Sequence, residues 1–144
     1  MEDAVERIKE QFQDKVLKLE KKSERRIYID FDPKEIPAVV KFIFTDLGCR
    51  FATATGIDTP SGIEILYHFS QDSTGKMISL RTLIQDKKQP AIQSITPIIR
   101  GAEWIEREIW ELLGVNFIGH PNLKHLLLVD KWPEGKYPLR HDQG

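Results

Sequence analysis

The sequence predicts an α+β fold in which helices pack on a mixed or antiparallel sheet and an extended C-terminal tail follows. Residues 63–70 and 77–85 are rich in β-forming residues and flank a polar connection, which is typical of a β-hairpin. Residues 102–113 repeat apolar side chains with a helical period, whereas residues 130–144 have no period. With 144 residues, 40% of them hydrophobic and 30% charged, the chain is expected to form one globular domain.

The N-terminal residues 1–24 are predicted to form an amphipathic helix that either packs on the domain or docks on a partner. Residues 25–129 are predicted to be the core domain, and its first strand is expected at residues 27–31. A second helix is expected to begin at Asp32 and Pro33, with Glu35 completing a capping box, and to end at Gly48.

The middle of the chain predicts a short strand over residues 49–55 and then a turn over 56–62. The second strand of the hairpin is expected to direct four side chains to one face: Ile78, Leu80, Thr82 and Ile84. Residues 86–90 are a charged loop, and Ser94 or Thr96 is a candidate to cap a short turn before the next helix.

The helix over residues 102–113 has an unusual outer face. Its apolar stripe ends at Gly114, which suits a helix C-cap. Trp104, Arg107, Trp110 and Glu111 lie away from that stripe, with Glu108 at its edge. Two tryptophans are not typical of a solvated face, so either another part of this chain or another protein is expected to cover it. We expect Glu108 to be partly buried and paired, Arg107 to point outward, and Glu103 to support Arg107 as a surface pair.

Several classes of function are disfavoured by composition. A net charge of −1 gives no general attraction to nucleic acid or anionic lipid. Cys49, the single cysteine, cannot form an internal disulfide or hold an iron–sulfur cluster by itself. No apolar run is long enough to span a membrane, and the histidine spacings match no familiar metal site. Glu106, Glu108 and Glu111 are expected to point in different directions on a solvated helix, which does not favour acid–base catalysis.

The order of residues in this helix and after it carries a resemblance to a known family. Glu106-Arg107-Glu108, Glu111, Leu112-Leu113, His120, Lys124 and Leu126-Leu127 occur in that order, with Gly119-His120-Pro121 between and Pro138-Leu139-Arg140 later. The chain resembles the C-type subunit of proton-pumping NADH–quinone oxidoreductase, respiratory complex I. That family is shared with membrane-bound energy-converting nickel–iron hydrogenases.

The resemblance implies a non-catalytic subunit of the peripheral arm, held at the cytoplasmic side of the membrane only through its complex. Its expected partners are the large quinone-site or hydrogenase subunit and a small iron–sulfur subunit. It implies that this chain binds no cofactor and no metal, while partner subunits carry iron–sulfur clusters or nickel–iron and the complex uses NADH or quinone. The residues that it assigns to partner docking are Trp104, Glu106, Arg107, Glu108, Trp110, Glu111, His120, Lys124 and Arg140.

The alternative hypothesis is a free-standing small binding module or small enzyme, in which the outer tryptophan face closes a ligand cleft. Neighbouring genes for a large subunit with quinone or nickel motifs would decide between the two. The sequence does not distinguish complex I from a hydrogenase, or identify the electron donor, the acceptor or the coupling ion.

Overall fold

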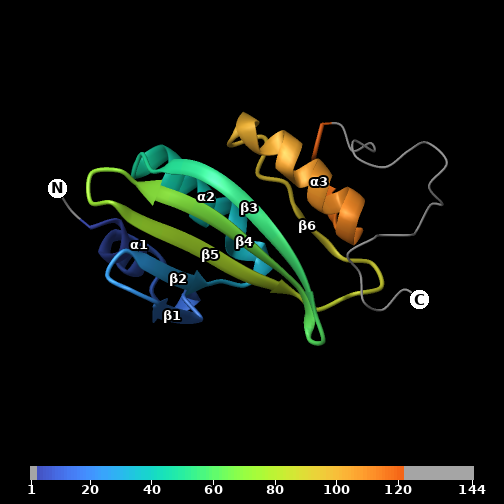
Figure 1. Ribbon diagram of the computed structural model, residues 1–144, viewed down its shortest axis with the longest axis horizontal. Helices are drawn as coiled ribbons and strands as arrows, with labels where there is room; N and C mark the ends of the chain where they lie inside the picture. The colour runs from blue at the N-terminus through green and yellow to red at the C-terminus, as the bar shows by residue number, and fades with distance from the viewer. Residues whose placement is uncertain (1–2, 122–144) are drawn as a thin grey trace.

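The computed structural model describes residues 3–121, which form a five-stranded mixed sheet with helices on one face (Figure 1). The strand order is β1-β2-β5-β4-β3; β2 and β5 are parallel, and the other neighbours are antiparallel. The strands are β1 (Lys18–Lys21), β2 (Arg26–Asp30), β3 (Arg50–Thr59), β4 (Gly62–Gln71) and β5 (Lys76–Ile84). The predicted α+β class with a mixed sheet is therefore confirmed.

The N-terminal segment is a helix only in its first half. In α1 (Ala4–Phe12), the Asp3 carboxylate accepts a hydrogen bond from the Val5 N–H, and a short 3-10 turn follows at Gln13–Lys15. The chain then enters β1, which pairs with β2 from Lys18↔Asp30 onward. The prediction of one helix over residues 1–24 is wrong beyond this turn, because backbone pairing with β2 outweighs a weak helical period. The apolar side of α1 packs in the main core.

The second helical segment begins as predicted at Asp32, whose carboxylate accepts the Lys34 N–H at 3.1 Å. A 3-10 turn (Pro33–Glu35) leads into α2 (Ile36–Lys41), which continues as a π-helical turn (Phe42–Asp46). Glu35 does not close a capping box; its carboxylate lies 3.6 Å from the Lys15 ammonium.

The two central hairpins are β3–β4 and β4–β5. The β4–β5 hairpin is where the sequence predicts it, and Ile78, Leu80, Thr82 and Ile84 are all buried. The predicted turn at 56–62 is wrong in extent, because β3 continues to Thr59. Gly56 lies inside this strand and faces α3 (Glu103–Leu113): a Cβ there would come within 2.6 Å of the Leu113 side chain. This glycine allows close helix packing and does not make a turn.

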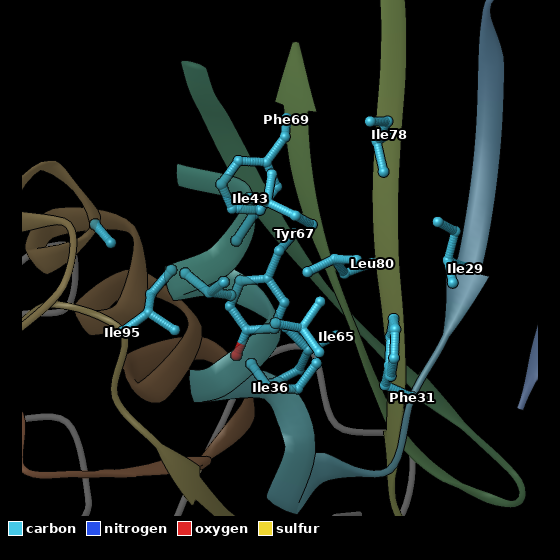
Figure 2. Packing of buried hydrophobic residues seen from close by; sticks show 14 of the residues in the cluster. Ile29, Phe31, Ile36, Ile43, Ile65, Tyr67, Phe69, Ile78, Leu80 and Ile95 are labelled. Atoms are coloured by element: carbon cyan, nitrogen blue, oxygen red, sulfur yellow. The ribbon is translucent and has the colours of Figure 1, made fainter. Parts of the chain in front are cut away.

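The main core lies between the sheet and the pair α1 and α2. Register places Ile27, Ile78 and Phe69 side by side on three neighbouring strands, and all three are buried. Figure 2 shows side chains of these strands packed against Ile36 and Ile43 of the α2 segment. A small parallel pair, β6 (Ala91–Gln93) and β7 (Asn116–Ile118), stands apart from the main sheet, and α3 flanks the β3 edge (Figure 1).

Candidate functional site

The candidate site is built around α3, which follows a 3-10 turn (Arg100–Ala102). Ile109 and Leu113 pack over Gly56 of β3, so the predicted apolar stripe is the face that meets the sheet. Gly114 has φ 80° and its N–H donates to the Trp110 carbonyl at 2.8 Å, which confirms the predicted C-cap.

Glu106 is buried and holds the loop that precedes the helix. Its carboxylate accepts three hydrogen bonds, from Ser94 Oγ at 2.5 Å, Thr96 Oγ1 at 2.7 Å and the Ile95 N–H at 2.8 Å. Ser94 Oγ in turn accepts the Thr96 N–H, as expected of a cap on a short turn. The prediction that Glu106 and Glu111 are solvated is wrong, because both are buried. Three donors allow a buried carboxylate to replace its hydration.

His120 connects the segment after β7 to the start of α3. Its ring Nε2 lies 2.9 Å from the Glu103 carbonyl, to which it donates, and 4.0 Å from a Glu106 carboxylate oxygen. The side chain is fully buried. His120 therefore fixes the point from which the chain continues beyond residue 121.

Trp104 lies on the outer face as predicted, whereas Arg107, which was predicted to point outward with it, does not. Trp104 is 64% exposed, whereas Arg107 is 4% exposed and its guanidinium carbon lies 5.1 Å from the Trp104 ring centre. The outward orientation predicted for Arg107 is wrong. No ion pair with Glu103 forms, and among residues 3–121 the Arg107 Nε and Nη2 have no hydrogen-bond acceptor.

The other predicted docking residues are distributed around the helix. Glu108 is half-buried as predicted, but within residues 3–121 no hydrogen bond or ion pair reaches it, so the predicted pairing is wrong there. Trp110 is half-buried and packs on the core. Lys124 and Arg140 lie outside the described residues. The predicted set is therefore not one surface: Glu106 and His120 face the interior, and Trp104 faces solvent.

A groove lies beside Trp104, and sequence reasoning, which placed a cleft at the tryptophan face only in its alternative hypothesis, did not identify the other walls. The groove has a volume of about 420 Å³ between the start of α3, the β3 edge and the end of the α2 segment. Its walls are mainly apolar and include Phe44, Phe51, Ile99, Trp104 and Ile105. These residues come from segments far apart in the sequence, so no local pattern could have indicated it. An exposed tryptophan next to such a groove is a common composition for a protein-binding site.

The described residues offer little for catalysis. Within residues 3–121 no three His, Cys, Asp or Glu side chains gather as metal ligands. His68 Nδ1 lies 2.7 Å from Ser79 Oγ, but Thr55, not a carboxylate, lies at its other nitrogen, so no hydrolytic triad forms. Burial, with the positive charge of Arg26, lowers the pKa of His68. Burial, with the negative charge of Glu106, raises the pKa of Tyr67 well above its ordinary value.

None of the helices in the described part of the chain is long and apolar enough to span a membrane.

Comparison with protein families gives a match over residues 29–144 to the model described as "Respiratory-chain NADH dehydrogenase, 30 Kd subunit". The chain is 34% identical over 120 residues to the C-type subunit of NADH-quinone oxidoreductase from Ruegeria pomeroyi, covering 79% of this chain and 58% of the relative. It is 36% identical over 117 residues to the C-type subunit from Mesorhizobium japonicum, covering 77% and 56%. It is 37% identical over 89 residues to the C/D-type subunit from Phocaeicola vulgatus, covering 61% and 17%. The chain thus spans little more than half of these C-type relatives.

Two solved structures share the fold. A chain of an archaeal respiratory membrane complex, the membrane-bound sulfane sulfur reductase, superimposes with a TM-score of 0.81 at 24% identity, over 96% of this chain and 82% of that chain. A trypsin-resistant fragment (1–134) of Nqo5 superimposes with a TM-score of 0.67 at 20% identity, over 84% of this chain and all of the fragment. At these identities the likeness shows a shared fold.

Proposed function

The chain belongs to the family of the 30 kDa subunit of respiratory-chain NADH dehydrogenase, and from this premise we propose that it is the C-type subunit in the peripheral arm of a complex-I-like NADH–quinone oxidoreductase. The observation that carries the proposal is the family match over residues 29–144, supported by C-type relatives at 34% and 36% identity. In this role the chain performs no redox step. It docks on the large quinone-site subunit and the small iron–sulfur subunit at the cytoplasmic side of the membrane, and supports electron transfer coupled to ion translocation. The clusters and substrate sites belong to those partners.

The docking surface that we propose is the groove beside Trp104. This side chain is 64% exposed and borders mainly apolar walls, so a partner side chain that enters the groove buries area on both sides. Glu106, with three hydrogen bonds inside the domain, acts by holding α3 against the loop at 94–96. Glu106 therefore contributes to assembly indirectly, because it keeps α3 in the position from which Trp104 borders the groove.

Purification of the tagged full chain from its native cells in mild detergent tests the role. We expect the quinone-site subunit and the iron–sulfur subunit to co-purify, with NADH–quinone reductase activity in the same fraction. A nickel-containing large subunit would instead assign the hydrogenase-type assembly. A lone chain that retains a small ligand would support the free-standing binding module and overturn the proposal.

A pair of matched variants tests the docking surface. Trp104→Glu places a charge at the groove, and Leu17→Glu changes a side chain of similar exposure, 66%, next to β1. Loss of a central aromatic contact costs about 2 kcal/mol or more, so we expect at least a ~30-fold weaker affinity for the large subunit with Trp104→Glu. Leu17→Glu is expected to bind normally. Equal binding by both variants, with unchanged melting temperatures, would remove Trp104 from the interface.

A further inference from the structure

The face of the sheet opposite the helices carries a row of polar side chains. Register places Tyr28 beside Ser79, Ser79 beside His68 and His68 beside Thr53, on four neighbouring strands. The residue that follows each of them in its strand is buried in the core on the helical side (Figure 1). The four polar side chains therefore share the other face of the sheet.

A pocket of about 190 Å³ opens on this row. Its wall also includes Arg26, which lies two residues before Tyr28 and so on the same face, and the apolar side chains of Ala52 and Met77. Among the described residues that line the pocket, none is acidic. The pocket offers a guanidinium, hydroxyls and an imidazole, which supply hydrogen-bond donors and positive charge, so an anion fits it better than a cation.

Arg26 is exposed and has no carboxylate partner within residues 3–121, although its face of the sheet carries acids. Two of these acids are engaged elsewhere. Asp30 accepts hydrogen bonds from Arg81 Nε and Nη2 at 2.8 and 3.2 Å, and Glu20 lies 3.2 Å from the Lys22 ammonium. In the first pair, the two nitrogens on one side of a guanidinium meet the two oxygens of one carboxylate. Arg26 can offer the same arrangement to a carboxylate from outside the domain.

His68 is held at both of its ring nitrogens. Its Nδ1 lies 2.7 Å from Ser79 Oγ, and its Nε2 lies 3.3 Å from Thr55 Oγ1. Burial, and then the positive charge of Arg26, lower the pKa of this ring, so the ring responds to charge on the Arg26 side of the pocket. An anion bound at Arg26 offsets that charge and raises the pKa of His68. The imidazole is therefore a reporter of an occupied pocket.

A single guanidinium beside apolar walls favours a carboxylate over a phosphate. A phosphate group carries close to two negative charges at neutral pH, and one guanidinium balances only one of them. We propose that this pocket binds a carboxylate group, whose two oxygens accept from Arg26 and whose attached carbon atoms pack against Met77 and Ala52. The carboxylate belongs either to a free short-chain acid or to an acidic side chain of the subunit that docks beside Trp104, because Ala52 and Thr53 line both the pocket and that groove. The second source rests on the function proposed above.

Titration of the full chain with acetate, followed by NMR of the His68 imidazole, tests the pocket. At constant neutral pH, and at an ionic strength held constant with chloride, acetate is expected to move the ring resonances saturably towards their protonated positions. Arg26→Gln removes the fork and is expected to weaken acetate binding about tenfold. Arg25→Gln is the matched control and is expected to bind normally, since Arg25 is also exposed but lies beside Gly75 in the turn after β4. Propionate is expected to bind about threefold more tightly than acetate, because its additional methylene packs on the apolar wall.

Met77→Glu supplies a competing carboxylate, since residue 77 is the register partner of Arg26. This variant is expected to raise the pKa of His68 and to lose acetate binding. Acetate binding that Arg26→Gln leaves unchanged would overturn the proposal, and so would His68 resonances that acetate does not move saturably. Tighter binding of inorganic phosphate than of acetate would indicate a general anion site and overturn the choice of a carboxylate.

The affinity of the purified large quinone-site subunit for variants of this chain identifies the source of the carboxylate. If Arg26→Gln weakens that affinity about tenfold while Arg25→Gln does not, an acidic side chain of the partner occupies the pocket. If the affinity is unchanged while acetate still binds the full chain, the ligand is a free acid. Both results support the pocket. If this subunit does not bind the wild-type chain, the proposed function fails, and the acetate titration still decides whether the pocket binds a carboxylate.

Discussion

Removing the Glu106 carboxylate should destabilise the domain, because three buried donors depend on it. Glu106→Ala leaves three buried donors, at Ser94, Ile95 and Thr96, without their acceptor. Each unsatisfied buried donor costs about 1–3 kcal/mol. The two hydroxyls can turn to other acceptors and are taken at about 1 kcal/mol each, whereas the Ile95 N–H cannot and is taken at about 1–2 kcal/mol, so the total is about 3–4 kcal/mol. At roughly 2–4 °C per kcal/mol for a domain of this size, the melting temperature should fall by about 10 °C.

The measurement is thermal and urea unfolding of the full chain, with two companion variants. Glu106→Gln keeps one acceptor oxygen for the Ile95 N–H, and the hydroxyls can accept from its amide, so it should cost roughly half as much. Glu108→Ala is the matched control on the same helix. Within residues 3–121 the Glu108 carboxylate has no partner, so removing it should change the free energy of unfolding by no more than about 0.5 kcal/mol. An unfolding free energy for Glu106→Ala equal to that of the Glu108 variant would refute the assignment of the three hydrogen bonds.

Two further predictions concern packing and pH. A Cβ at Gly62 would lie 2.3 Å from the Ile84 carbonyl oxygen, and one at Gly56 would meet only side-chain atoms of α3, at 2.6 Å or more. Gly62→Ala should therefore prevent folding or lower the free energy of unfolding by more than about 3 kcal/mol. Gly56→Ala should lower it by about 1–3 kcal/mol. Gly101→Ala, where no atom lies within 4 Å, should leave it almost unchanged, and urea melts measure all three. Because burial and then Arg26 lower the pKa of His68 in the folded state, the unfolded state binds more protons below the ordinary value of 6.5. The contribution of His68 to the free energy of unfolding is thus present above that pH and is lost as the pH falls towards the folded pKa. Urea melts between about pH 7.5 and 5 should show a free energy of unfolding that falls with pH, and His68→Gln should make this dependence weaker.

Local patterns were sufficient for the elements whose own residues determine them. The β4–β5 hairpin, the helix up to Gly114 and the Asp32 cap are set by alternation, period and capping chemistry, and all three are present. The strand β1 was missed because its backbone bonds come from β2, while its side chains continue the spacing of α1. The turn at 56–62 was predicted too long because a glycine that admits a helix has the same local signature as a glycine that makes a turn.

The polar residues of α3 show why a helical wheel could not locate the docking surface. A wheel divides a helix into one buried and one exposed side, which holds when a single layer covers it. Here β3 covers the Ile109 side, and the loop at 94–96 supplies three donors to Glu106 on another side. A charged residue on such a helix is buried wherever the fold supplies partners for it, and those partners lie ten to twelve residues away in the case of Glu106. Trp104 has the opposite arrangement: a large apolar side chain remains exposed next to an apolar groove. The feature of this helix that indicates a protein partner is therefore an exposed apolar side chain, and not the charged residues.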